Sequence, residues 1–159
     1  MGDESSGREN EAGNRSEEES LKRARDMLEY IETQVERGKA GGVDFSEMEA
    51  MLSGARIMIE SGELEDAVEL IGICTEKAGK RFSEHEKLVF SIRRTERDIK
   101  AAHDSGKDVS EAGRLLKLAR VHMERGDYVL GIESAKHALE TLTQKKPTDI
   151  VWGSGLAES

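Results

Sequence analysis

The strongest constraint on this chain is a duplication within it. Residues 42–76 align with residues 106–140 at a constant offset of 64, without a gap. Eleven of the 35 aligned positions are identical, and pairs such as Ile57/Val121 are closely similar. Self-similarity over such a period is typical of proteins built from stacked units, each packed against its neighbour. The duplication therefore predicts a repeat architecture.

Composition favours helices as the repeated elements. Charged residues and hydrophobic residues each make up 36% of the chain, and aromatic residues only 4%. This balance is normal for amphipathic helices with solvated outer faces and is thin for a buried sheet. The single proline, Pro147, lies near the C-terminus and leaves the preceding chain without the strongest helix breaker. We therefore expect an all-α fold.

Hydrophobic periodicity predicts about six helices, in two cycles of three. One face of the first helix is marked at three- and four-residue spacing by Leu21, Ala24, Leu28, Ile31 and Val35. The expected helices cover about residues 20–37, a second helix that begins within 44–47 and ends at 61, a third from about 63 to 78–79, and then 83–103, 110–125 and 127–143. They form one helical repeat domain over residues 20–143, with unit one at 20–79 and unit two at 83–143.

Several polar residues and glycines predict where these helices begin and end. Asp44 with Glu47, or Ser46 with Glu49, has the spacing of a capping box at the start of the second helix. Gly38 is the expected C-cap of the first helix. The repeated glycines Gly62 and Gly126 predict tight turns between paired helices.

The two ends of the chain differ from this domain. Residues 1–19 are rich in acidic and small residues and have no large apolar residue after Met1, which predicts a disordered acidic arm. We expect residues 144–159 to form a flexible tail. The tail holds the only tryptophan, in the apolar run Ile150, Val151 and Trp152. This run is a candidate for docking onto a partner or onto the bundle, or it begins a further domain.

The paired helices resemble tetratricopeptide (TPR) repeats. In the second copy Ala119 matches the small residue of the first helix, Gly126-Asp127-Tyr128 the turn, and Ala138 the last small position. The resemblance implies a TPR-like helical array. The period of 64 exceeds the family's 34, and no proline closes either pair, so an extra helix precedes each pair. The alternative is two spectrin-like three-helix bundles joined by a linker near residues 79–82.

Two arginines are the leading candidate site residues. Arg56 and Arg120 occupy the same repeat position, and the resemblance implies that this position faces a concave, peptide-binding groove. Arginines there would hold carboxylates of an acidic ligand by bidentate hydrogen bonds. The alternative is pairing along their own helices with Glu60 and Glu124, four residues on.

Other residues give no catalytic or metal-binding pattern. His85, His103, His122 and His137 lack metal-ligand spacing, and His85 is interpreted as a solvated residue at a helix start. The single cysteine, Cys74, lies in an apolar run and is expected to be buried in a reducing compartment. The sequence has no P-loop, dinucleotide fingerprint or nucleophile elbow. We expect no enzyme activity, no cofactor and no metal.

These observations together favour a cytoplasmic, non-enzymatic protein–protein interaction scaffold or adaptor. Its partner would be a peptide or helix of another protein, bound on the helical-repeat surface. The alternative is a structural protein that self-assembles into homo-oligomers. The net charge of −9 disfavours nucleic acid, no apolar run is long enough to span a membrane, and no small-molecule substrate is evident.

Overall fold

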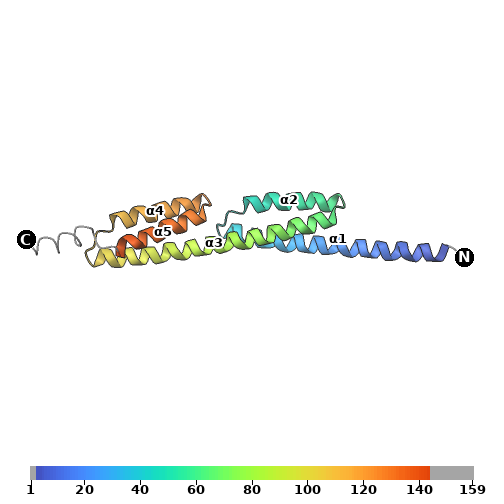
Figure 1. Ribbon diagram of the computed structural model, residues 1–159, viewed down its shortest axis with the longest axis horizontal. Helices are drawn as coiled ribbons and strands as arrows, with labels where there is room; N and C mark the ends of the chain where they lie inside the picture. Colours follow the sequence, from blue (N-terminus) through green and yellow to red (C-terminus); the bar gives the residue numbers. More distant parts are fainter. Residues whose placement is uncertain (1–2, 144–159) are drawn as a thin grey trace, which may run out of the picture. The chain divides into compact units, whose positions relative to one another are not determined.

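The computed structural model describes residues 3–143, with side chains from residue 12 onward. Every regular element in this range is a helix, which confirms the all-α class (Figure 1). The helices are α1 (Asp3–Ala40), α2 (Ser46–Glu60), α3 (Leu64–Asp104), α4 (Ser110–Glu124) and α5 (Tyr128–Thr143). The described chain thus has five helices in place of the six that periodicity predicts.

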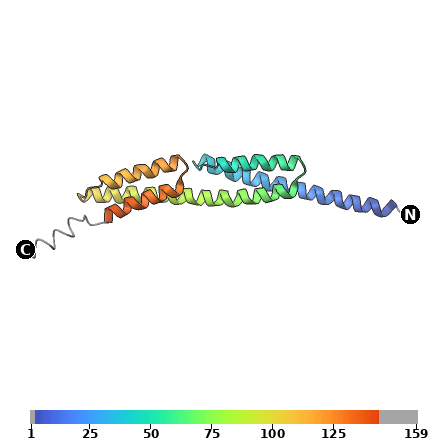
Figure 2. The ribbon, with the colours of Figure 1, turned by 45° about the horizontal axis from the view of Figure 1, so that its top comes forward.

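The fold divides into two compact units, with the boundary between Ser83 and Glu84. In unit one, α1 and α2 pack with residues 64–83 of α3. In unit two, α4 and α5 lie side by side against residues 84–104 of α3 (Figure 2). Each unit is therefore a three-helix group, and the boundary falls inside a helix.

The predicted break between the third and fourth helices does not exist, because α3 runs through residues 79–82. Arg81 continues the three- and four-residue spacing of buried positions across this stretch, half-buried between Ala78 and His85. The buried positions on this face of α3 are Ile71, Cys74, Ala78, His85, Leu88, Ile92 and Thr95. Gly79 is tolerated within the helix at a cost of about 1 kcal/mol relative to alanine. The expected linker near residues 79–82 was wrong.

Both ends of α1 also differ from the sequence prediction. The helix includes residues 3–19, where the sequence predicts a disordered arm. Glutamate is a good helix former, and acidic side chains near a helix N-terminus are stabilised by the helix dipole. At the other end, Gly38 is not the cap. The helix continues to Ala40, and Gly42 turns the chain with a φ of 90°.

Gly38 is required inside α1 because the ring of Phe45 occupies the space beside it. A Cβ added at Gly38 would lie 2.1 Å from Cε2 of Phe45. At the repeat-related positions of unit two the residues are Ala102 and Val109. The larger residue on the helix therefore accompanies the smaller residue on the loop.

The interior of unit two contains a second exchange of this kind. A Cβ at Gly131 would lie 2.7 Å from Cδ2 of Leu88 and 3.3 Å from the carbonyl oxygen of Ala119. Unit one has Ala24 and Ala67 at the positions of Leu88 and Gly131, and both alanines are fully buried. In a close-packed interior the glycine in unit two makes room for the leucine, whereas unit one has a small side chain at both positions. The duplicated units thus bury residues at corresponding positions, although few of these core residues are identical.

The repeated Asp-x-Ser segment starts α2 and α4 by a turn and not by the predicted capping box. Oδ1 of Asp44 accepts hydrogen bonds from the Ser46 amide at 3.1 Å and the Ser46 hydroxyl at 2.6 Å. Asp108 and Ser110 repeat this geometry at 3.0 and 2.7 Å. The N-cap of α2 is Phe45, whose side chain makes no capping hydrogen bond. The predicted turns at Gly62 and Gly126 are present, with φ of 78° and 77°.

Candidate interaction surface

Arg56 on α2 forms an ion pair with Glu32 on α1. Its Nη2 lies 2.6 Å from Oε1 of Glu32, and its Nε donates to the same oxygen at 2.7 Å. The Arg56 side chain is 55% exposed and that of Glu32 is 29% exposed. The predicted pairing along the helix with Glu60 is therefore replaced by a bond between two helices of unit one.

Unit two repeats this ion pair at the positions offset by 64. Nη2 of Arg120 on α4 is paired with Oε1 of Glu96 on α3. Exposed ion pairs contribute little to stability, about 0–1 kcal/mol each. Spacing along α2 and α4 does not identify these two glutamates as partners of the arginines. The available signal was that Glu32 and Glu96 are related by the same offset as the two arginines.

The paired glutamates change the candidate role of both arginines. A carboxylate ligand would have to displace Glu32 or Glu96, or bind the guanidinium nitrogens that these glutamates leave open. Partner binding by Arg56 and Arg120 stays a prediction. Both arginines lie on the outer faces of α2 and α4, and each is followed in the sequence by an apolar residue.

Ile57 and Val121 are exposed apolar residues at one repeat position. The exposed fraction is 63% for Ile57 and 37% for Val121. Single exposed apolar residues are ordinary on protein surfaces. Here the exposure recurs in both units, beside the two repeated ion pairs, although neither side chain belongs to the core of its unit.

The long helices carry exposed aromatic residues that do not follow the repeat. Tyr30 is 64% exposed, Phe82 is 48% exposed and Phe90 is 67% exposed. The residues related to Tyr30 and Phe90 by the offset of 64 are Arg94 and Asp26. These aromatics therefore distinguish one unit from the other.

His85 is buried, which corrects its interpretation as a solvated residue at a helix start. It lies within α3 at 7% exposure, and its ring packs edge-on against Tyr128, with centroids 5.1 Å apart. The reason is that α3 does not begin at residue 83. Within residues 12–143, no three His, Cys, Asp or Glu side chains are grouped closely enough to hold a metal ion.

Cys74 is fully buried, as the sequence predicts. Its Sγ lies 3.7 Å from the carbonyl oxygen of Met48, and burial raises the pKa of its thiol. A high thiol pKa and an inaccessible sulfur both oppose nucleophilic reactivity. The geometry therefore supports a packing role for this residue in unit one.

The other predicted partner-binding residues, Ile150, Val151 and Trp152, lie outside the described residues. Comparison with protein-family models, curated protein sequences and solved structures finds no match to this chain. The TPR resemblance therefore stays a prediction. None of the helices in the described part of the chain combines the length and the apolar content needed to cross a membrane.

Proposed function

We propose that this protein is a non-enzymatic scaffold that binds a helix or peptide of another protein on the outer faces of α2 and α4. The observation that supports this proposal is the repeated exposure of Ile57 and Val121, each next to an interhelical ion pair. In each unit an exposed apolar side chain flanked by charges suits the apolar face of an amphipathic helix.

The proposal gives the repeated arginines a supporting role. Arg56 and Arg120 flank the apolar positions and already contact glutamates of the neighbouring helix. Such rim charges orient a partner and raise its association rate more than they raise affinity. Affinity would come mainly from apolar contacts at Ile57 and Val121.

The test uses the purified chain as bait in an extract of its host, followed by mass spectrometry. The informative variant is Ile57→Asp/Val121→Asp, because it removes the apolar contacts and leaves both ion pairs in place. A matched control is Thr33→Asp/Arg97→Asp, a repeat-related pair of exposed residues on α1 and α3. The scaffold proposal expects a stoichiometric partner that the control retains and the variant loses. A partner retained by both variants would contradict this binding surface.

A second candidate function is self-assembly, which the exposed aromatics of the long helices favour. Tyr30, Phe82 and Phe90 offer large apolar area at low entropic cost to a second copy of the chain. Sedimentation equilibrium distinguishes the two functions. A mass that rises with concentration, and falls to the monomer in Phe90→Glu, would favour self-assembly over the scaffold.

A further inference from the structure

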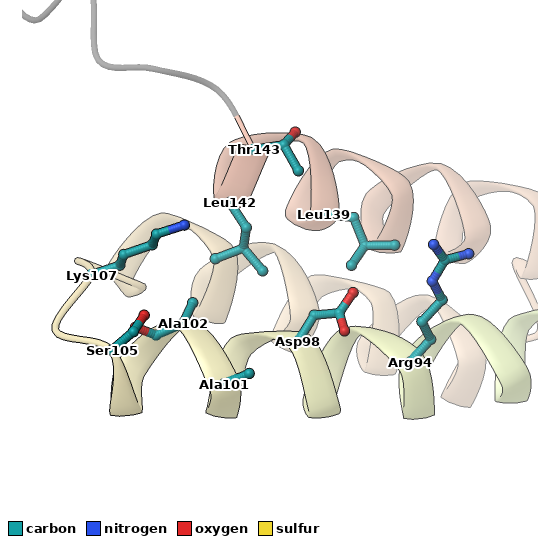
Figure 3. Close-up of a pocket in the computed structure, with 9 residues that line it drawn as sticks. All are labelled: Arg94, Asp98, Ala101, Ala102, Ser105, Lys107, Leu139, Leu142 and Thr143. Atoms are coloured by element: carbon teal, nitrogen blue, oxygen red, sulfur yellow. The ribbon is translucent and has the colours of Figure 1, made fainter.

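Unit two has an open groove between the C-terminal ends of α3 and α5. Its volume is about 380 Å³. Leu139 and Leu142 of α5 point across it toward α3, where Ala101 and Ala102 line the opposite wall (Figure 3). Thr143, the last residue that the structure describes, also lines the groove. The chain therefore continues beyond α5 from the edge of this groove.

The corresponding loop of unit one, after α1, has two buried apolar residues. Val43 and Phe45 are each only 4% exposed, and Ala78 on α3 is 6% exposed. At the positions of Val43 and Phe45, unit two has Lys107, which is exposed, and Val109, which is half-buried. The loop of unit two thus has no aromatic side chain and buries less apolar surface.

Apolar side chains at the groove of unit two are only partly buried. Leu142, the counterpart of Ala78, is larger and is only half-buried, as is Leu139. Leu142 packs on one side against the core cluster that contains Ala138. Its other side faces the groove (Figure 3). Leu139 and Leu142 therefore offer partly exposed apolar surface to a further segment.

We propose that the segment Thr148–Trp152 of this same chain fills the groove. Residues 144–147 separate Thr143 from this segment, and connections of two to six residues suffice to reverse a chain. The groove extends along α3 from Arg94 to Ser105, a rise of about 16 Å. Five residues in extended form span about 17 Å, which matches that length.

Charge and direction are both consistent with this occupant. A segment returning from Thr143 passes Lys107 first and reaches Arg94 last, since these residues lie at opposite ends of the groove (Figure 3). Asp149 then lies near Lys107, and Trp152 lies between Leu139 and Arg94. An arginine over an indole ring adds a cation–π attraction to the apolar contact.

Trp152 is the only tryptophan of the chain, so its fluorescence reports directly on this contact. The experiment measures emission wavelength and acrylamide quenching of the full chain, with a free peptide of residues 144–159 as the exposed reference. We expect emission at shorter wavelength than the peptide and quenching reduced about twofold or more, because most of the ring is buried. Quenching equal to that of the peptide would overturn the proposal.

A groove-filling variant tests where the tryptophan is bound. Ala101→Arg places a long side chain in the groove from an exposed helical position, and arginine is a good helix former. Its quenching should rise to the peptide value while the circular dichroism stays unchanged. Ala50→Arg, an exposed position on α2, is the matched control and should keep the tryptophan protected. Protection that survives Ala101→Arg would overturn the proposed site.

A charge reversal in the loop and a dilution series complete the test. Lys107→Glu lies in the loop before α4 and sets a like charge near Asp149, so it should raise quenching even if Ala101→Arg fails to fold. Protection by the same chain is independent of protein concentration. Protection that disappears on dilution would show that a second copy supplies the tryptophan, and would contradict docking within the chain.

Discussion

The ring of Phe45 lies where a side chain on Gly38 would have to be, and this contact fixes how the loop after α1 packs in unit one. The aromatic ring is 4% exposed, so it has little room to move. In unit two the corresponding residues are Ala102 and Val109. We therefore expect substitutions at residues 38 and 45 to have strongly non-additive effects on the free energy of unfolding.

We expect Gly38→Ala to lower the free energy of unfolding by about 1–3 kcal/mol, because overpacking outweighs the gain in helix propensity. Adding Phe45→Val should relieve the clash, since the double variant reproduces the pair found in unit two. A double-mutant cycle by urea unfolding should give a coupling of about 1–3 kcal/mol. Gly72→Ala, where a Cβ would meet no atom within 4 Å in the described structure, is the control. Strictly additive effects would contradict the proposed exchange.

Unit two offers an independent test of the same principle at Leu88 and Gly131. Gly131→Ala brings a methyl group against Leu88 and should destabilise the protein by about 1–3 kcal/mol. Leu88→Ala alone leaves a cavity in the core and should cost about 2–5 kcal/mol. The double variant copies Ala24 and Ala67 of unit one, so it should be more stable than the sum of the single effects predicts. Thermal unfolding followed by circular dichroism measures each difference.

The pH dependence of stability should include a contribution from Asp44. Hydrogen bonds from Ser46, followed by the charge of Arg81, hold the pKa of the Asp44 carboxyl below its ordinary value of 3.8. A carboxyl whose pKa is lowered on folding stabilises the protein fully above the unfolded pKa. This stabilisation is lost as the pH falls below 3.8 through the folded value.

The variant Asp44→Asn keeps the acceptor for Ser46 but no longer titrates. Its unfolding free energy should therefore decrease less than that of the unchanged protein as the pH is lowered from 5 to about 3. Urea titrations at several pH values measure this difference. Asp26→Asn, on the exposed face of α1, provides a comparison for loss of one acidic group. Parallel pH profiles for the unchanged protein and Asp44→Asn would show that Asp44 contributes nothing.

Cys74 should react slowly with thiol reagents in the folded protein. Its sulfur is buried and its thiol pKa is raised by that burial, so both access and thiolate content are low. The rate of reaction with a disulfide reagent should rise by orders of magnitude in denaturing urea. Equal rates in the folded and unfolded protein would mean that unit one opens readily around α3.

The core faces of the helices could be predicted from the sequence because they follow a single spacing. Ala24, Leu28, Ile31 and Val35 are buried as expected, and Leu21 is half-buried. Helix ends were harder, since a glycine has several uses. Gly62 and Gly126 end helices with positive φ, whereas Gly38 makes room for an aromatic ring. Only the tertiary contact with Phe45 separates these two uses.

The candidate site shows the same limit. The repeat identifies Arg56 and Arg120 as a related pair. Spacing along a helix, however, points to acidic partners three or four residues away and not to partners on another helix. The bonds to Glu32 and Glu96 depend on how α1 approaches α2, and how α3 approaches α4. The offset of 64 adds Glu32 and Glu96 to the candidate partners, but it also relates Glu60 to Glu124, so only the helix packing decides between them.

The continuity of α3 gives the last prediction, at Gly79. This residue is exposed, and a Cβ there would meet no atom of the described structure within 4 Å. Alanine is favoured over glycine inside a helix by about 0.5–1 kcal/mol, so Gly79→Ala should raise the unfolding free energy by that amount. Gly79→Pro should lower it strongly, because proline removes a helical hydrogen bond and clashes with the preceding turn. If residues 79–82 were instead a linker, neither substitution would change the unfolding free energy measured in urea. That result would contradict a continuous α3.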